Sequence, residues 1–392
     1  MKFNYTTGYA GTGKSKRLLE LLLTLPETSI LLAPTHKALD RLKGEVMSNI
    51  ELKTIHSLLG WIPTINEDAE HINHIETTAR LNRPLDNYTD IVIDEAGMMS
   101  EDMLLDITSK LEERNNFETD HITIHLFLDP YQLLPVKGVQ IQIEPEFTTN
   151  LTKQYRAESP DVVALFTKFV TYLEGTNDGD LSTPYSENVL PLDLTQFREG
   201  DRLLAYTNAQ VGHYNTEIAK LLGIESWEGQ EVQLGSRLST DICEGIINPT
   251  FSDLKIAFEE GSLLLQNSQI NKKYLDNALW DLHGHPDIDF ITMGEYIVPV
   301  VIGIGRANKV HKAAKEAALD NRRLFKDVYA LGRAFTMDYS FATTVHKAQG
   351  SEFSRVFIDK ADIQKSIFRG SYNNYARLMY VAISRCKNTI YI

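Results

Sequence analysis

Eight residues near the amino terminus, from Gly8 to Ser15, have the types and spacing of a phosphate-binding loop. They read Gly-Tyr-Ala-Gly-Thr-Gly-Lys-Ser and fit the pattern G-x-x-x-x-G-K-[ST] without a mismatch. In such a loop the glycines let main-chain N–H groups point at phosphate oxygens, and the following helix directs its positive dipole end at the same anion. The lysine would reach the terminal phosphates, and the serine hydroxyl would bind Mg²⁺. The predicted nucleotide-binding residues are Gly8, Gly11, Thr12, Gly13, Lys14 and Ser15.

The segments on either side of the loop support this interpretation. Residues 2–7 are typical of a short strand, and residues 16–23 carry the apolar stripe of an amphipathic helix. A strand, a glycine-rich turn and a helix in this order form the geometry that phosphate binding requires. The alternative, a chance glycine-rich turn before a helix, does not account for both flanks. We therefore expect a nucleoside triphosphate site.

Two adjacent carboxylates supply the second element of hydrolytic chemistry. Asp94 and Glu95 end the apolar run that begins at Asp90. Asp94 would hold Mg²⁺, and Glu95 would orient and deprotonate the attacking water. Such a pair after a strand is more often a solvated loop, but its position downstream of a phosphate-binding loop favours the functional interpretation.

Composition limits the class of protein. The chain has 392 residues, of which 43% are hydrophobic, and a formal net charge of −14. Such a chain forms two or three globular domains rather than a disordered polymer. The acidity argues against a surface that coats nucleic acid through bulk positive charge, although a local basic groove remains compatible with it. No apolar run approaches the length of a membrane span, and the first residues contain the strand of the phosphate-binding loop where the apolar stretch of a signal peptide would lie, so we expect a cytoplasmic protein. Cys243 and Cys386 lack metal-ligand or disulfide spacing, so we expect reduced thiols.

Alternating strand and helix patterns predict the fold class. Apolar runs at 29–33, 90–95, 122–128, 203–206, 356–358 and 389–392 are typical of strands, and 37–46 is typical of an amphipathic helix. This alternation predicts an α/β protein with two parallel sheets, whose ligands lie beyond the carboxyl ends of the strands. We expect a first domain at 1–150 with an inserted subdomain at 61–86. A second domain would occupy 151–392, with an insert at 225–330.

Nine segments, taken together, resemble superfamily 1 DNA helicases, and within them the RecD-like group (SF1B) that includes the phage Dda helicase. The likeness covers nearly the whole chain, in the family's order. The segments are 8–15, 33–38, 54–60, 94–98, 129–136, 151–156, 205–208, 344–353 and 380–385. The resemblance implies two RecA-like domains in tandem, with a small pin-like insert in the first and an SH3-like insert in the second. It also implies ATP and Mg²⁺ as cofactors.

The resemblance assigns roles around the nucleotide. Charge that spreads over the γ-phosphoryl oxygens needs cations beyond the loop lysine, and Arg156 and Arg385 would reach ATP from the second sheet. Gln132 would sense the γ-phosphate, Tyr155 would stack on adenine, and Glu352 would contact the ribose. An isolated arginine is more often part of a surface salt bridge, and Tyr155 could equally be a core aromatic. The predicted catalytic residues are Lys14, Glu95, Gln132, Arg156 and Arg385.

The resemblance also points to a track for single-stranded DNA. Small hydroxyls and main-chain N–H groups suit phosphates that must be gripped and released in each cycle. The histidines could instead be structural, and Trp61 could pack the core of its own insert rather than stack on a base. The predicted DNA-binding residues are Pro34, Thr35, His36, Thr54, His56, Ser57 and Trp61 from the first sheet and its insert, with Thr344, His346 and Lys347 from the second.

Two features depart from the family pattern. Family members usually carry a glutamine-containing segment before the loop that reads adenine, and only seven residues precede Gly8, so base selectivity stays open. In the segment around Asp129, Leu128 stands where glycine is common, although Gln132 is intact.

The leading hypothesis is an ATP-dependent helicase on single-stranded DNA and on junctions of single-stranded with duplex DNA. The resemblance implies 5′→3′ travel, a role in replication or recombination in a phage, contacts with replication proteins, and a monomer. One alternative is a translocase that strips proteins or remodels branched DNA without processive unwinding. Others are a P-loop phosphotransferase acting on a small molecule and a non-catalytic nucleotide-gated binding module. DNA-independent turnover would distinguish the phosphotransferase.

Overall fold

The protein, seen in a computed structural model, consists of two compact units. The first comprises Met1–Leu192 with Ala348–Ile392, and the second comprises Asp193–Lys347. The structure describes residues 1–34, 38–39, 42, 44–46, 50–59, 61–65, 72–76, 88–114, 118–134, 141, 143–175, 181–225, 230–235, 242–251, 289–293, 296–303, 309–310, 312–313, 316 and 335–392.

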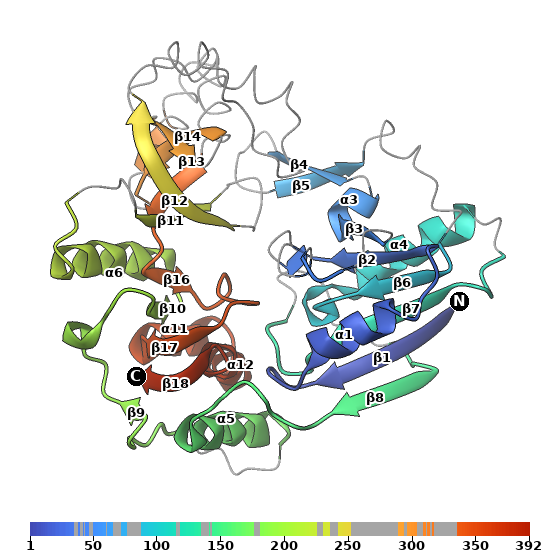
Figure 1. The fold of residues 1–392 in the computed structure, drawn as a ribbon, viewed down its shortest axis with the longest axis horizontal. Helices are drawn as coiled ribbons and strands as arrows, with labels where there is room; N and C mark the ends of the chain where they lie inside the picture. The colour runs from blue at the N-terminus through green and yellow to red at the C-terminus, as the bar shows by residue number, and fades with distance from the viewer. Residues whose placement is uncertain are drawn as a thin grey trace. The chain divides into compact units, whose positions relative to one another are not determined.

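A six-stranded parallel sheet forms the centre of the first unit (Figure 1). Its strand order is β3-β2-β6-β7-β1-β8, and each neighbouring pair is parallel. A parallel sheet is buried on both faces, and its central strands are accordingly apolar. The strands are β1 (Lys2–Gly8), β2 (Ser29–Ala33), β3 (Glu51–Thr54), β6 (Asp90–Ile93), β7 (Thr123–Leu128) and β8 (Phe147–Leu151).

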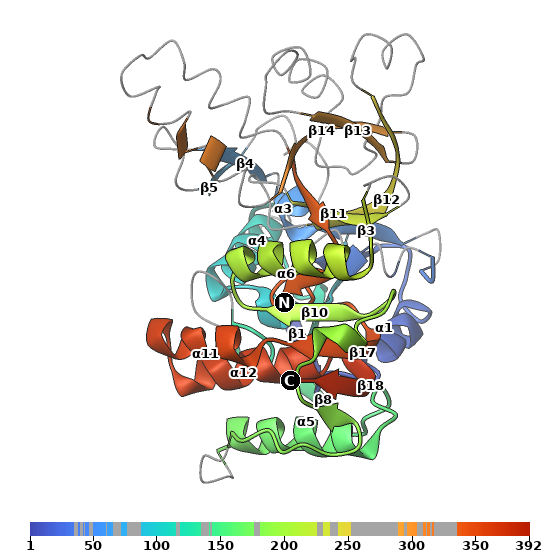
Figure 2. The same cartoon turned by 90° about the vertical axis from the view of Figure 1, so that its left-hand side faces the viewer.

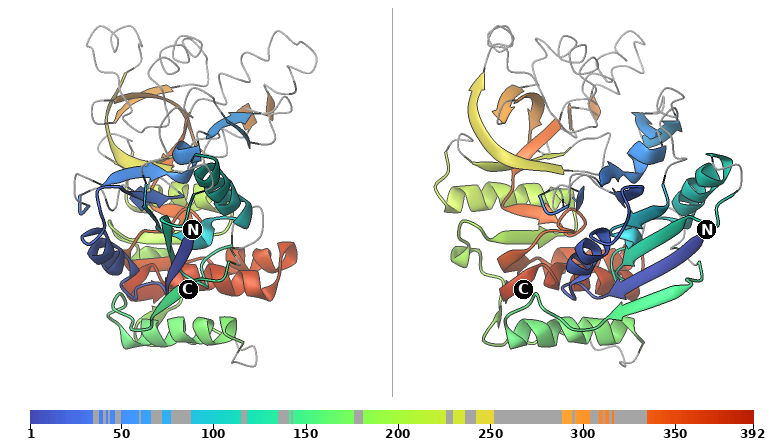
Figure 3. Two further views of the ribbon diagram at one scale, coloured as in Figure 1. Left: turned by 90° about the vertical axis from the view of Figure 1, so that its right-hand side faces the viewer. Right: turned by 45° about the vertical axis from the view of Figure 1, so that its right-hand side comes forward.

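Two helices cover opposite faces of this sheet, α1 (Lys14–Leu22) in dark blue and α4 (Glu101–Arg114) in teal (Figure 3). Side chains of a strand alternate between faces, and β2 shows this directly. Leu31 packs with Leu18 of α1, whereas Ile30 packs with Leu104 of α4. The sheet is thus packed on both faces.

The remaining elements of the first unit come from distant parts of the chain. A hairpin of β4 (Trp61–Ile65) and β5 (Ile72–Glu76) follows α3 (Ile55–Leu59), and a 3-10 turn, η1 (Ala96–Met98), follows β6. The parallel strands β17 (Phe353–Ile358), β18 (Cys386–Tyr391) and β9 (Val189–Leu190) pair in that order. Helices α5 (Pro160–Leu173), α11 (Lys360–Arg369) and α12 (Tyr372–Ile383) complete the unit, and eight of the twelve residues of α12 are buried.

The second unit combines a parallel strand pair with a small barrel. After η2 (Leu194–Gln196), β10 (Arg202–Ala205) pairs in parallel with β16 (Ala342–Thr344). Helix α6 (Asn208–Leu221) lies against both strands (Figure 2). A closed barrel contains β11 (Glu231–Gly235), β12 (Ile242–Phe251), β13 (Asp289–Met293), β14 (Tyr296–Ile302) and β15 (Phe335–Tyr339). Its β14–β15 pair is parallel and its other described pairs are antiparallel.

The predicted α/β class with parallel sheets is confirmed. The strand expected over residues 90–95 ends at Ile93, because Glu95 turns the chain with a positive φ of 52°. The expected domain boundary after residue 150 divides the chain by sequence position. The two compact units are instead defined by packing, and the first contains two separate segments, so the boundary stays a prediction. The inserts at 61–86 and 225–330 also stay predictions, because large parts of both lie outside the described residues. Within the described part of the chain, no helix has both the length and the apolar character to cross a membrane.

Candidate functional site

The phosphate-binding loop has a conformation that requires its glycines. Gly11 and Gly13 have φ angles of 80° and 88°, and Gly13 immediately precedes α1. A Cβ atom on Gly11 would lie 1.9 Å from Oε1 of Gln154 and 2.7 Å from Cβ of Arg156. An alanine there would therefore be strained in its backbone and would clash with its neighbours. In a phosphate-binding loop, the free N–H groups of the loop and of the first helical turn would face the bound anion.

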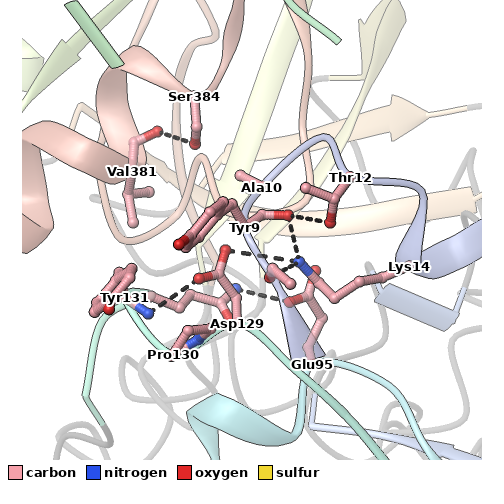
Figure 4. Close-up of polar contacts among 12 residues, drawn as sticks. Tyr9, Ala10, Thr12, Lys14, Glu95, Asp129, Pro130, Tyr131, Val381 and Ser384 are labelled. Carbon is pink, nitrogen blue, oxygen red and sulfur yellow. Dashed lines mark hydrogen bonds and ion pairs between the residues drawn. The ribbon is translucent and has the colours of Figure 1, made fainter. Parts of the chain in front are cut away.

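Lys14 lies folded back against the loop (Figure 4). Its Nζ donates to the carbonyl oxygens of Gly8, at 2.7 Å, and Tyr9, at 2.9 Å. The same nitrogen lies 3.7 Å from Oδ2 of Asp129, which is itself buried. A phosphate oxygen that entered the loop would compete with these carbonyls for the ammonium.

Asp94, Glu95 and Gln132 meet at the carboxyl ends of β6 and β7. Asp94 is buried, and Glu95 is the one non-glycine residue with a positive φ among those described. Nε2 of Gln132 donates to Oε2 of Glu95 at 2.7 Å, while the buried Oε1 of Gln132 has no partner in the described structure. A free acceptor beside a carboxylate suits a water that must be oriented for attack. In this arrangement the Gln132 amide donates to Glu95 rather than toward a phosphate.

The residues present fit ATP with Mg²⁺. Ser15 belongs to the first turn of α1, next to Lys14, and Asp94 ends the neighbouring strand. Hydroxyl and carboxylate oxygens are the ligands that Mg²⁺ prefers. The space beside Gly13 is open, since a Cβ placed there meets no atom within 4 Å. When bound, Mg²⁺ would neutralise charge on the β- and γ-phosphates, and these two side chains would hold it.

Arg156 is fixed by an ion pair with Glu352. Its Nη2 lies 2.7 Å from Oε1 of Glu352, and its Nη1 donates to the carbonyl oxygen of Ser384 at 3.0 Å. Lys387 contacts the other carboxylate oxygen of Glu352 at 3.3 Å. Burial by itself would raise the pKa of Glu352, but Arg156 and Lys387 outweigh it and lower the pKa. Glu352 is thus an ionised centre between cations, and its predicted ribose contact stays a prediction.

The Glu352→Gln variant tests this pairing. The substitution removes the negative charge that pairs with Arg156, so the guanidinium is held less firmly. We expect kcat for ATP hydrolysis to fall about tenfold, because a displacement of a full 1 Å would lower it roughly 10²-fold. Steady-state hydrolysis at saturating ATP measures it. Glu158→Gln, at an exposed carboxylate two residues from Arg156, should stay within about twofold of the parent. Equal rates for the two variants would show that Arg156 needs no orientation by Glu352.

Arg385 is buried at the end of α12. Its Nε donates to the carbonyl oxygen of Val381 at 3.1 Å, and its Nη2 donates to Oγ of Ser384 at 2.7 Å. Burial, and then repulsion from Arg156, lowers the pKa of Arg385 to about 10, against the opposing influence of Glu95. The guanidinium is therefore protonated at pH 7 and lies within the electrostatic reach of both the other arginine and the carboxylate.

Tyr155 lies beside the loop with an exposed ring. Its N–H donates to the carbonyl oxygen of Gly11 at 2.8 Å, and 65% of the residue's surface is exposed. Nζ of Lys153 lies 5.0 Å from the ring centroid. An exposed aromatic face anchored to a phosphate-binding loop is suited to stacking on a base, so the core alternative is not favoured.

Several residues at the site were not assigned a role from the sequence. Tyr380 hydrogen-bonds to both Ala10 and Asp129, and Nε2 of Gln154 donates to the carbonyl oxygen of Ala10 at 2.6 Å. Arg377 donates to the carbonyl oxygens of Pro130, at 2.9 Å, and Gln132, at 2.7 Å. Gln154 and Tyr380 belong to segments that carry the family resemblance, which was the available signal. Their partners lie more than 140 residues away in sequence, so spacing alone could not pair them.

In the first unit, the predicted DNA-binding residues cluster after β2 and β3. Thr54 ends β3, and its Oγ1 accepts a hydrogen bond from the Ser57 N–H at 3.2 Å, which caps α3. Thr54 is buried, whereas His56 and Ser57 are half-exposed. Pro34 follows β2, and Trp61 begins β4. Thr35, His36 and the side chain of Trp61 lie outside the described residues.

The second unit repeats this capping geometry. Thr344 ends β16 and is buried, and its Oγ1 accepts from the Lys347 N–H at 3.3 Å. His346 is 6.0 Å from Tyr206, measured between ring centroids. Neighbouring atoms lower the pKa of His346 by desolvation, although the residue is exposed at the surface. Desolvation also lowers the pKa of Lys347, partly countered by Asp338. Thr54 and Thr344 thus each accept a hydrogen bond from the residue three positions later. The contacts of these segments with DNA stay predictions.

The fold places a phosphate-binding loop at the carboxyl edge of a parallel sheet, and comparisons with known proteins match a domain family to each end of the chain. Residues 2–137 match the AAA domain family, and residues 339–392 match the UvrD-like helicase C-terminal domain. An uncharacterized protein of Acanthamoeba polyphaga mimivirus is 29% identical over 189 residues. That alignment covers 42% of this chain and 36% of the viral protein, so the chain spans about a third of the length of this relative.

Solved helicase structures share the fold along the whole chain. Pif1 helicase from a study of two coordinating Pif1 helicases at forked duplex DNA is 15% identical, with a TM-score of 0.55, covering 100% of this chain and 87% of that one. Bacteroides Pif1 in complex with ADP-AlF3 and single-stranded DNA is 16% identical, with a TM-score of 0.51 and coverages of 100% and 88%. Candida albicans Pif1 is 15% identical, with a TM-score of 0.50 and coverages of 100% and 91%.

Two segments of the chain thus match known domain families, the second of them a helicase domain, and the chain shares the fold of the solved Pif1 structures. The narrower resemblance to the Dda helicase is not tested by these comparisons and stays a prediction.

Proposed function

We propose that the chain is an ATP-driven DNA helicase that moves along single-stranded DNA. One observation carries the proposal. Arg156 packs beside Gly11 of the phosphate-binding loop and donates to the carbonyl oxygen of Ser384, next to Arg385. Ala10 in the loop is hydrogen-bonded to Tyr380 of α12, the helix that ends just before Arg385. Cations brought to a P-loop by a second element make hydrolysis respond to that element's position, which a motor requires.

The hydrolytic roles follow from the site. Lys14 would hold the terminal phosphates, and Ser15 and Asp94 would hold Mg²⁺. Glu95 would accept a proton from the attacking water, which the free oxygen of Gln132 would help to orient. Arg156 and Arg385 would stabilise the charge of the transition state, and Tyr155 would stack on the base. This assignment predicts that loss of any one of these charges affects turnover more than folding.

The DNA substrate is supported by the relatives and by the two capping motifs. Solved Pif1 proteins are described with single-stranded DNA and with forked duplex DNA. His56 and Ser57, with His346 and Lys347, occupy equivalent turns after strands of the two units. The β4–β5 hairpin directly follows the first of these turns and would separate the strands at a junction. We infer 5′→3′ movement and a replication or recombination role, as a monomer in the cytoplasm of a phage host, from the family resemblance alone.

Steady-state ATP hydrolysis with and without a single-stranded DNA oligonucleotide tests the proposal. We expect strong stimulation by DNA, and loss of turnover in Lys14→Ala, because that variant removes the cation from the phosphate-binding loop. DNA-independent turnover would instead support a phosphotransferase that acts on a small molecule. If DNA stimulates hydrolysis, a forked duplex and a protein-blocked strand then separate unwinding from protein displacement.

A further inference from the structure

Tyr380 joins three parts of the first unit through one hydroxyl group. The residue belongs to α12 and is fully buried. Its hydroxyl accepts a hydrogen bond from the N–H of Ala10 at 2.8 Å and donates one to Oδ2 of Asp129 at 2.7 Å. The phosphate-binding loop, the end of β7 and the carboxy-terminal helix are therefore connected at a single atom.

Asp129 extends this connection to the lysine of the loop. Its Oδ1 accepts from the N–H of Tyr131 at 3.0 Å, and its Oδ2 lies 3.7 Å from Nζ of Lys14. A buried carboxylate needs such partners to remain ionised. Burial, and then the charge of Asp129, raises the pKa of Tyr380 well above its ordinary value. The hydroxyl therefore keeps its proton at neutral pH and remains the donor.

A second contact fixes the same helix one turn earlier. Arg377 lies three residues before Tyr380, on the same side of α12. It donates to the carbonyl oxygens of Pro130 and Gln132, at 2.9 Å and 2.7 Å. One turn after Tyr380, the helix ends beside Ser384 and Arg385. Helix α12, which ends just before Arg385, is thus tied to the residues around Gln132 and to the phosphate-binding loop at successive turns.

We propose that Tyr380 is a positioning residue for ATP hydrolysis, whose hydroxyl holds the phosphate-binding loop and Asp129 in the correct place relative to Arg385. The inference rests on the proposed function, because it takes ATP as the substrate. When a charged group that stabilises a transition state is displaced by about 1 Å, the reaction rate falls about 10²-fold. Tyr380 does not itself need to touch the nucleotide.

Tyr380→Phe removes the hydroxyl and keeps the ring, which packs 5.0 Å from the Phe166 ring between centroids. We expect kcat for ATP to fall about 10-fold to 100-fold, with KM changed by less than about threefold, since ground-state binding is retained. Tyr375→Phe is the matched control on the same helix. The Tyr375 hydroxyl is buried and makes no hydrogen bond of ordinary geometry with the described residues, although Gln364 lies near it. Its kcat should stay within about twofold of the parent.

A double-mutant cycle separates positioning from general loss of structure. If Tyr380 acts through the arginine, Tyr380→Phe should lower kcat by less than about threefold in an Arg385→Ala background. Equal effects in both backgrounds, or a kcat of Tyr380→Phe within twofold of the parent, would overturn the inference. Loss of fluorescent ADP binding together with turnover would also overturn it, because the hydroxyl would then maintain the loop itself. If DNA does not change the rate of ATP hydrolysis by the parent protein, the proposed motor function is wrong. The kcat values of the parent and Tyr380→Phe, measured without DNA, would still test the role of Tyr380.

Discussion

Glu95→Gln is expected to bind nucleotide and DNA like the parent protein and to lose hydrolysis by about 10² to 10⁴-fold, the usual contribution of a general base. The replacement is isosteric, and the glutamine oxygen can still accept the hydrogen bond that Gln132 donates at 2.7 Å. Only the ability to take a proton from water is removed. Single-turnover hydrolysis and nucleotide binding by fluorescence measure the two properties separately.

The matched control for this variant is Glu20→Gln, the same substitution on the exposed surface of α1. Glu20 pairs there with Arg17 at 3.5 Å, with both side chains about half exposed, so its loss should change neither stability nor turnover appreciably. Parent-like turnover in Glu95→Gln would remove this residue from the mechanism and direct attention to another base.

Arg385→Ala is expected to lower kcat by about 10³-fold or more while nucleotide affinity changes far less, as for other arginines that act in phosphoryl transfer. The guanidinium donates to Val381 and Ser384 at the end of the preceding helix, α12, and Glu95 and Arg156 contribute to its electrostatic surroundings. Its bonds must therefore be exchanged when charge develops on the phosphate. Comparison of kcat with the dissociation constant for ATP measures this difference.

Arg385→Lys provides the control, because it keeps a cation but not the planar fork. We expect an intermediate rate and a thermal unfolding midpoint close to that of the parent, whereas a common loss of folding would lower both variants together. A fall in ATP affinity without any change in kcat would contradict a role in the transition state.

The sequence predicts best those elements whose pattern lies within a few neighbouring residues. The loop glycines, the strand before them and the helix after them lie where expected, because pattern, turn chemistry and helix start agree there. The run at 29–33 is a strand with all five residues buried. The position of Glu95 after a strand was predicted, but its left-handed backbone was not, since propensity disfavours that conformation for glutamate.

What sequence reasoning missed depends on long-range pairing. The barrel strands lie in a segment without clear periodicity, and they pair with partners as far apart as Val232 and Tyr339. Likewise, Arg156 was expected to meet a phosphate, but its ion pair with Glu352 could not be read from either segment alone. Contacts of this kind join segments far apart in the sequence, which short local patterns do not encode.

The hydrogen bond between Ala10 and Tyr380 joins residues that are 370 positions apart. During synthesis, the phosphate-binding loop therefore leaves the ribosome long before the helix that completes its surroundings. A nascent or truncated chain that stops short of α12 carries the full loop motif but neither Tyr380 nor Arg385. Because domains begin to fold as they emerge, such a chain would form the first sheet without a complete hydrolytic site. Under the proposed mechanism, the phosphate-binding loop would therefore gain its full hydrolytic site only after α12 has been synthesised.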